Sequence, residues 1–399
     1  MPLMTTLDVC IRGSGAVGLA LALALARQGL RVGLTGAAPV AGAADARTDV
    51  RTYALNAASR ALLVELKVWA ALPADAVTPV DDMHIEGDGA AGGADGGAGG
   101  GAGRTAAGSL DFSAWAQGSD ALAWIVDAAE LDAALRTAAR FAPHLAWLPG
   151  AAADGLADAS GAALTVLAEG RASAARQALG VRFDVMAYGH SALAARLVAS
   201  QPHAGVARQW FLAPDVLALL PFDRPQPGHS HGLVWSLPTA RALALRDAPA
   251  AEFEAALAQA TGGAAGTLTL ASERSTWPLA LAQADALCGP GWALVGDAAH
   301  LVHPLAGQGL NLGLADVAAL ARVIAEREPW RALGDTTLLR RYARQRAGPT
   351  RAMALVTDGL LHLFAHPQPA LRELRNRGMT LLNHLPTLKR LLTARALDA

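Results

Sequence analysis

The glycine spacing near the N-terminus constrains the fold more than any other feature of the chain. Between a strand-like apolar run at Leu7–Arg12 and a helix-like apolar run at Val17–Gln28, the sequence reads Gly13-Ser14-Gly15-Ala16-Val17-Gly18. Gly13 permits a tight turn, Gly15 lets a pyrophosphate approach the backbone, and Gly18 lets the helix pack closely on the strand. The helix N-terminus offers free N–H groups to the phosphates. This spacing predicts a Rossmann-like α/β domain that binds a dinucleotide.

The next predicted strand, Arg31–Thr35, departs from this pattern at its end. An acidic residue normally follows such a strand and accepts hydrogen bonds from the adenosine ribose. Here the strand is followed by Gly36, and the next acids, Asp45 and Asp49, belong to an expected loop. We therefore expect the ribose to be held differently or more weakly.

Size and charge narrow the class of protein. A chain of 399 residues fits two closely packed domains rather than one core. The formal net charge is -1, and the 33 basic residues form no run, which argues against a nucleic-acid partner. The first apolar stretch is broken by Arg12 and three glycines, and no uninterrupted apolar run is long enough to cross a membrane. We expect a cytoplasmic protein.

Apolar periodicity predicts three regions. They are a discontinuous dinucleotide-binding domain of residues 1–75, 120–190 and 285–335, a mixed-sheet substrate domain of residues 76–119 and 191–284, and a helical C-terminal region of residues 336–399. The Gly- and Ala-rich segment 87–108 is a predicted surface loop. Predicted strands lie at Val216–Leu220, Gly232–Leu237, Thr267–Ala271 and Trp292–Val295, and predicted helices at Ala128–Arg140, Ala251–Thr261, Leu310–Arg327, Leu338–Met353 and Ala354–Phe364.

A second fingerprint follows the predicted strand Trp292–Val295. The sequence reads Gly296-Asp297-Ala298-Ala299-His300 and continues, after His303 and Pro304, with Gly307-Gln308-Gly309-Leu310-Asn311-Leu312-Gly313. An aspartate directly after a buried strand can accept hydrogen bonds from a ribityl hydroxyl group. The glycine loop runs into a helix whose N-terminus would face the flavin ring or a phosphate. This stretch predicts FAD as the dinucleotide.

With these motifs the chain resembles the class A flavoprotein monooxygenases, typified by para-hydroxybenzoate hydroxylase, and more narrowly the ubiquinone-biosynthesis hydroxylases. The similarity also includes Asp49-Val50-Arg51-Thr52-Tyr53-Ala54-Leu55, Leu233-Val234-Trp235-Ser236-Leu237-Pro238, Trp277-Pro278-Leu279, and the stretch from Leu371-Arg372 to Lys389-Arg390. The resemblance implies that Arg51 reaches the flavin region, that Asp297 holds the ribityl chain, and that the loop 307–313 backs the isoalloxazine. It predicts that the cofactor-binding residues are Gly13, Ser14, Gly15, Ala16, Val17, Gly18, Arg51, Gly296, Asp297, Pro304, Gly307, Gln308, Gly309, Leu310 and Asn311.

The same resemblance implies a reaction. NAD(P)H would reduce FAD, molecular oxygen would add to the reduced flavin as a hydroperoxide, and the distal oxygen would pass to an electron-rich aromatic ring. The flavin carries this chemistry, so we assign no catalytic base. The protein must supply an apolar, closed pocket, for which the predicted lining is Leu219, Trp235, Trp277 and His303. Trp277 fits core packing and a lid over the flavin equally well. We predict no metal site, because His300 and His303 have no third ligand at helical spacing.

A third family motif, an Asp-Gly segment implicated in flavin and NAD(P)H handling, is altered. The matching stretch reads Met186-Ala187-Tyr188-Gly189-His190-Ser191, one residue shorter and with Tyr188 at the aspartate position. Three hypotheses follow. The chain hydroxylates a polyprenylated phenol in ubiquinone biosynthesis; or it is a catalytically impaired relative that serves as a partner in a biosynthetic complex, as Gly36 and Tyr188 favour; or it hydroxylates a soluble phenol.

The C-terminal segment Met379–Ala396 has helical amphipathic spacing. Leucines recur near one face, and Lys389, Arg390 and Arg395 are interspersed among them. A core or homodimer contact explains this pattern. A peripheral contact with the inner membrane is the alternative, attractive because ubiquinone precursors carry an isoprenoid tail. The oligomeric state stays open.

Overall fold

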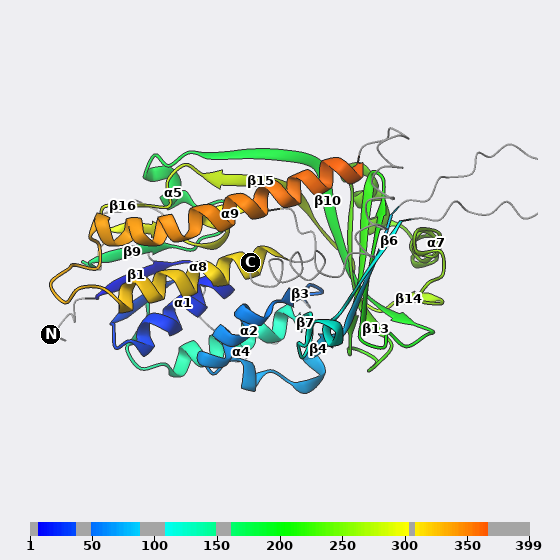
Figure 1. Cartoon of the computed structure of the whole chain (residues 1–399), viewed down its shortest axis with the longest axis horizontal. Helices are drawn as coiled ribbons and strands as arrows, with labels where there is room; N and C mark the ends of the chain where they lie inside the picture. The colour runs from blue at the N-terminus through cyan, green and yellow to red at the C-terminus, as the bar shows by residue number, and fades with distance from the viewer. Residues whose placement is uncertain (1–6, 37–48, 88–107, 149–160, 303–307, 366–399) are drawn as a thin grey trace, which may run out of the picture.

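The computed structural model describes residues 7–36, 49–87, 108–148, 161–302 and 308–365. A six-stranded sheet forms the half of the molecule that carries the N-terminal glycine loop (Figure 1). Its order is β16 (Cys288–Gly289), β17 (Trp292–Leu294), β9 (Leu164–Leu167), β1 (Val9–Arg12), β2 (Val32–Thr35) and β8 (Leu145–Leu148). All neighbours pair in parallel except the edge pair β16 and β17. The α/β prediction is confirmed.

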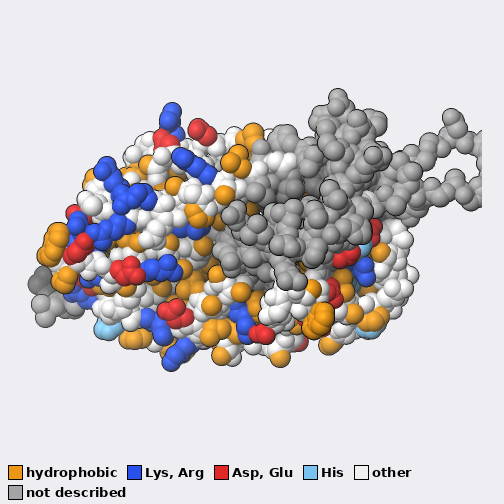
Figure 2. All heavy atoms as spheres, viewed as in Figure 1, with side chains coloured by type: hydrophobic (Ala, Val, Ile, Leu, Met, Phe, Trp, Pro, Cys, Tyr) orange, Lys and Arg blue, Asp and Glu red, His pale blue; other side chains and the backbone are white. Residues whose placement is uncertain are grey.

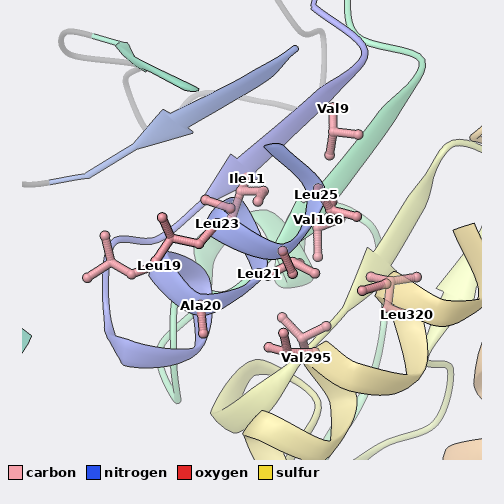
Figure 3. Close-up of a cluster of buried hydrophobic side chains, with 14 of the residues drawn as sticks. Val9, Ile11, Leu19, Ala20, Leu21, Leu23, Leu25, Val166, Val295 and Leu320 are labelled. Carbon is pink, nitrogen blue, oxygen red and sulfur yellow. The ribbon is translucent and has the colours of Figure 1, made fainter. Parts of the chain in front are cut away.

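Helix α1 (Ala16–Arg27) is the centre of this half. Every residue from Gly18 to Ala26 is buried, because the helix packs on the sheet and also contacts α4 (Ala128–Phe141) and α8 (Gln308–Ala325). Figure 3 shows Ile11 of β1, Leu21 of α1 and Leu320 of α8 within one apolar cluster. Helix α1 therefore has a continuous apolar sequence with no polar face because it is buried on all sides.

A nine-stranded mixed sheet forms the other half. Its order is β18 (His300–Leu301), β15 (Ser275–Ala284), β10 (Phe183–Ala199), β13 (Ser230–Pro238), β12 (Asp215–Phe222), β11 (Val206–Leu212), β5 (Asp82–Glu86) and β6 (Ser109–Ser113), with β14 (Leu268–Leu270) paired to β10. Helices α6 (Thr239–Asp247) and α7 (Ala250–Thr261) cover its outer face. A three-stranded sheet packs on its inner face and consists of β3 (Thr52–Leu55), β7 (Ala123–Asp127) and β4 (Val77–Val80).

Short elements connect these layers. They are the helices α2 (Ala57–Glu65), α3 (Ala114–Gln117) and α5 (Ala174–Ala178), and the 3₁₀ turns Trp69–Ala71, Ala74–Ala76 and Gly296–Ala298. On the face in Figure 2, basic and acidic side chains are interspersed over the half that carries the six-stranded sheet. Within the described ranges, no helix combines the length and the apolar character needed to span a bilayer.

Strand β10 links the two halves. It is 17 residues long, and its register against β15 shifts between Ala187 and Ser191. The predicted domain boundary between residues 190 and 191 falls inside this strand, at the irregularity rather than in a loop. The division into domains stays a prediction.

The C-terminal helices predicted at Leu338–Met353 and Ala354–Phe364 are one helix, α9 (Thr336–Ala365), which contains Pro349. A proline inside a helix removes one hydrogen bond and crowds the residue before it. That residue is Gly348, which has no side chain to clash with the proline ring. The helix is also anchored by buried contacts upstream, since the Tyr342 hydroxyl donates to the Leu294 carbonyl at 2.7 Å. Pro349 therefore does not divide it.

A buried histidine in β13 makes stability sensitive to acid. His231 is 1% exposed, and neither ring nitrogen has a hydrogen-bond partner among the described residues. Burial lowers the pKa of His231 from 6.5 to about 4. Above pH 6.5 the ring is neutral in both states. Between these two pH values only the unfolded chain binds the proton, so the folded state loses about 3 kcal/mol.

We therefore expect His231→Leu to reduce the acid sensitivity of the protein. The measurement is the free energy of unfolding in urea at a series of pH values. The wild type should lose about 3 kcal/mol more than the variant between pH 7 and pH 4. Parallel pH dependences of the two proteins would show that His231 is not the responsible group.

Candidate functional site

The N-terminal glycine loop has the geometry that its spacing predicts. Gly13 has φ +114°, and a Cβ there would lie 2.2 Å from the Ala168 carbonyl oxygen. A Cβ on Gly18 would lie 2.0 Å from the Gly13 carbonyl oxygen. By contrast, a Cβ on Gly15 would have no heavy atom within 4 Å. Packing thus requires glycine at positions 13 and 18. Gly15 instead faces open space at the start of α1, where a phosphate group fits.

The second fingerprint packs directly on this loop through Val17. A Cβ on Gly313 would lie 2.5 Å from the Val17 side chain, and one on Gly296 would lie 3.2 Å from it. Gly309, in the first turn of α8, again has open space where a Cβ would be. The two glycine motifs, nearly 300 residues apart in the chain, therefore form one site with the N-termini of α1 and α8 beside it.

Asp297 and Arg51 line a concave part of this site. Both side chains are exposed, yet the protein around Asp297 raises the pKa of its carboxyl group through burial, against the opposing effect of His300 and Arg51. A side chain that is both accessible and surrounded by protein lies in a hollow. Tyr53 lies beside Arg51, whose guanidinium is 5.8 Å from the tyrosine ring centroid.

Arg51 is held in place by a chain of charged groups. Its Nη2 lies 2.6 Å from Asp49 Oδ2, a hydrogen bond that raises the pKa of Arg51. The Asp49 carbonyl accepts a bond from Arg196 Nη2 at 2.9 Å, and Arg196 also pairs with the buried Asp127 at 3.0 Å. Since Arg196 belongs to β10 and Asp127 caps α4, Arg51 is fixed at the junction of the two halves.

Close backbone packing sets the distance between this junction and the large sheet. A Cβ on Gly232 of β13 would lie 2.5 Å from Thr52 Oγ1. Thr52 directly follows Arg51, so the missing side chain at Gly232 lets the arginine approach the inner face of the sheet.

The amide of Asn311 ties the start of α8 to the segment after β3. Asn311 is 1% exposed. Its Nδ2 donates to the Ala54 carbonyl at 2.9 Å, and its Oδ1 accepts from the Asn56 N–H at 3.1 Å and the Ser59 hydroxyl at 2.8 Å. These bonds position the helix start. Direct contact between this side chain and the cofactor stays a prediction.

The predicted substrate-pocket residues are only partly brought together. Leu219 and Trp235 are fully buried on the outer face of the large sheet, under α6 and α7, so their assignment as pocket walls is wrong. Alternation places their neighbours Ala218 and Val234 on the inner face. Trp277 pairs with Ala192, which shares the inner face with Arg196, and stays a candidate. His303, like Pro304 and Gly307, lies outside the described residues.

The two departures from the family pattern have different structural settings. Gly36 has φ +138°, and a Cβ there would lie 2.4 Å from Ser14 Oγ. A carboxylate side chain therefore has no room at this position, so Gly36 is built into the packing of the glycine loop. Tyr188 is half-buried in β10, and its carbonyl accepts a bond from His190 Nδ1 at 2.9 Å.

Sequence reasoning missed Asp316 and Arg346. Both are buried, and they form one network with His300, whose Nε2 lies 2.7 Å from Asp316 Oδ2. The available signal was an aspartate inside the apolar run 312–325, a position where a charged side chain needs a partner. Within the described ranges, no group of three potential ligands could hold a metal ion.

Replacing Asp297 tests whether the hollow is the site that binds FAD. We expect Asp297→Ala to raise the dissociation constant for FAD at least tenfold, or about 1.4 kcal/mol, because the carboxylate no longer accepts hydrogen bonds from the ribityl chain. Asp297→Asn, which keeps one acceptor oxygen, should lose less. Fluorescence titration of the flavin-free protein measures both constants.

Asp285→Ala is the matched control, since it removes an exposed carboxylate that pairs with Arg182 at 3.0 Å on the edge of the molecule. It should bind FAD like the wild type. Wild-type affinity in Asp297→Ala would exclude Asp297 from the cofactor site.

Comparison with known proteins agrees with this geometry. A family model described as an FAD binding domain matches residues 149–357. Ubiquinone hydroxylase UbiL of Rhodospirillum rubrum is 31% identical over 406 residues, covering 98% of this chain and 89% of that protein. The 3-demethoxyubiquinol 3-hydroxylase of Escherichia coli is 30% identical over 399 residues, covering 96% of each. Among solved structures, PqsL of Pseudomonas aeruginosa, described as a probable FAD-dependent monooxygenase, gives a TM-score of 0.70 at 21% identity, covering 94% of this chain and 99% of that chain.

The residues present fit FAD as the cofactor. Open space at Gly15 accommodates a pyrophosphate, and Asp297 offers a carboxylate to ribityl hydroxyl groups in the hollow beside it. The prediction of FAD is confirmed. The chain belongs to the family of FAD-dependent aromatic monooxygenases that includes the hydroxylases of ubiquinone biosynthesis.

Proposed function

We propose that this protein hydroxylates the aromatic ring of a polyprenylated phenol in ubiquinone biosynthesis, with NAD(P)H as reductant and molecular oxygen as the oxygen source. The observation that carries the proposal is the match to the Escherichia coli 3-demethoxyubiquinol 3-hydroxylase, which covers 96% of each chain. A match of this extent spans the large mixed sheet as well as the two glycine motifs.

The side chains around the site support this reaction. When bound, FAD takes electrons from NAD(P)H and supplies activated oxygen. The open glycine loop would bind its pyrophosphate, and Asp297 would orient its ribityl chain. The inner face of the large sheet carries Ala218, Leu220 and Val234 opposite β3. This packed apolar cluster would give the site a dry base that keeps water from the reacting ring, which limits wasteful release of peroxide.

The test is a turnover assay with the FAD-loaded protein, NADH or NADPH, and air-saturated buffer. Two substrates are compared, a phenol with a polyprenyl chain in detergent and the same phenol without the chain. We expect the prenylated phenol to gain one oxygen atom, seen by mass spectrometry, with matching consumption of the reduced nicotinamide. Hydroxylation of the unprenylated phenol alone would support the soluble-phenol alternative instead.

The catalytically impaired alternative predicts different behaviour. This alternative rests on Gly36 and Tyr188, which depart from the family's flavin motifs. Relatives named as ubiquinone hydroxylases nevertheless match over nearly the whole chain. A purified protein that stays colourless after incubation with FAD would support it and contradict the hydroxylase. A peripheral membrane contact or a homodimer through Met379–Ala396 stays a prediction, since that segment lies outside the described residues.

A further inference from the structure

A buried charged network lies directly behind the turn that carries Asp297. At its centre is Asp316 of α8, which is 0% exposed. Asp316 Oδ2 accepts hydrogen bonds from the Gly296 N–H at 2.9 Å and from His300 Nε2 at 2.7 Å. Asp316 Oδ1 accepts from Arg346 Nε of α9 at 2.6 Å. One carboxylate thus joins the Asp297 turn to two helices.

The network holds the turn on both sides of Asp297. Gly296 immediately precedes it, with φ +61°, and His300 follows it by three residues. Both bind the same carboxylate oxygen. Arg346 completes the link because its Nη2 also donates to the Leu312 carbonyl at 3.2 Å, so hydrogen bonds connect α9, α8 and the turn.

The charges in this network compensate one another. Burial alone would raise the pKa of Asp316, but His300 and Arg346 hold it below its ordinary value. Burial alone would lower the pKa of His300, but Asp316 beside it raises the pKa above its ordinary value. A buried carboxylate is tolerated when it is paired and hydrogen-bonded in this way, whereas removing one partner is strongly destabilising. Such a group can hold a backbone turn rigidly, because few alternative arrangements would satisfy all of its hydrogen bonds.

We propose that Asp316 is a positioning residue for FAD binding, which fixes the Gly296 N–H and His300 so that Asp297 is presented to the ribityl chain, and that Arg346 acts through it. Asp316 is 0% exposed and Arg346 is 6% exposed, so both act through the turn rather than at the protein surface. The proposal rests on FAD binding and is independent of which phenol is hydroxylated, so a negative turnover assay leaves it intact.

The principal test is Asp316→Asn, which keeps the shape of the side chain but removes its charge. The NH2 group of the new amide cannot accept a hydrogen bond. It would face either Arg346 or the pair Gly296 and His300, so the hydrogen bonds on that side are lost. We expect the dissociation constant for FAD to rise at least tenfold. We also expect the visible absorption bands of the flavin bound at saturation to shift, because the flavin would sit differently.

A pair of variants on α9 separates positioning from general stability. Arg346→Met removes the partner of Asp316, and Tyr342→Phe removes an equally buried bond, from the Tyr342 hydroxyl to the Leu294 carbonyl, that does not involve Asp316. Both should lower the melting temperature of the FAD-free protein. Only Arg346→Met should weaken FAD binding, by at least fivefold, and Arg346→Lys should restore part of the affinity.

These variants also decide the matter if Asp316→Asn does not fold. The proposal would be overturned if Arg346→Met and Tyr342→Phe both lower the melting temperature and both bind FAD within twofold of the wild type. The network would then only stabilise the fold.

Discussion

Gly15→Val is expected to abolish retention of FAD while the FAD-free protein stays folded. Gly15 precedes α1 with φ -76° and ψ 177°, an extended conformation that valine adopts readily. Its Cβ would meet no heavy atom within 4 Å. The free energy of unfolding should therefore change by no more than about 1 kcal/mol, the usual scale for a residue before a helix. The new side chain would instead fill the space into which the pyrophosphate fits.

The expected loss of affinity is at least about hundredfold, or about 2.7 kcal/mol, because the phosphates lose their approach to the N–H groups of α1. Fluorescence titration with FAD gives the affinity, and urea unfolding without FAD gives the stability. Gly359→Ala is the control, since Gly359 is an exposed helix residue that also has open space around it. It should raise stability by about 0.5–1 kcal/mol and leave FAD binding unchanged. Wild-type affinity in Gly15→Val would refute the phosphate site.

Gly13→Ala is expected to have the opposite profile and prevent stable folding. Its Cβ would lie 2.2 Å from the Ala168 carbonyl oxygen and 2.8 Å from the Glu169 nitrogen, both of them backbone atoms that cannot move aside as a flexible side chain can. The φ of +114° adds strain for any residue with a side chain. Separating β1 from the end of β9 to make room would open the centre of the six-stranded sheet. We expect a loss above about 4 kcal/mol.

The yield of soluble protein and its far-ultraviolet circular dichroism on heating measure this effect. A substitution two residues away, Gly15→Val, serves as the comparison under the same conditions. A Gly13→Ala protein that melts within a few degrees of the wild type would mean that the glycine loop is not packed against β9 as described.

Local patterns sufficed for those parts of the fold whose reasons are local. The β1, α1, β2 unit was predictable because its apolar runs and glycines all act within 30 residues of chain. Asp297 and Arg51 were identified through motifs that resemble a known family, and both line the hollow. In the middle region, the four predicted elements agree with β12, β13, β14 and α7 within two residues, whereas β10, β11, β15 and α6 were not predicted.

Errors arose where side chains on one strand face different neighbours. Leu219 and Trp235 lie in apolar strands that are buried on both faces, so the sequence shows no alternation that separates the inner face from the outer one. Only the pairing of β12 with β13 and the helices packed over them place these two residues away from the site. Likewise, the sequence predicted two helices, Leu338–Met353 and Ala354–Phe364, where the structure has the single helix α9.

The sequence by itself determined the α/β class, the glycine loop and the carboxylate after β17, because each depends on residues that are close in the chain. Tertiary structure alone decided which of those groups share a site and what holds them there. Val17 against Gly296 and Gly313, Arg196 against Asp49, and Arg346 against Asp316 each join segments tens to hundreds of residues apart. Such contacts depend on how helices and sheets pack, which the order of residues along one element does not specify.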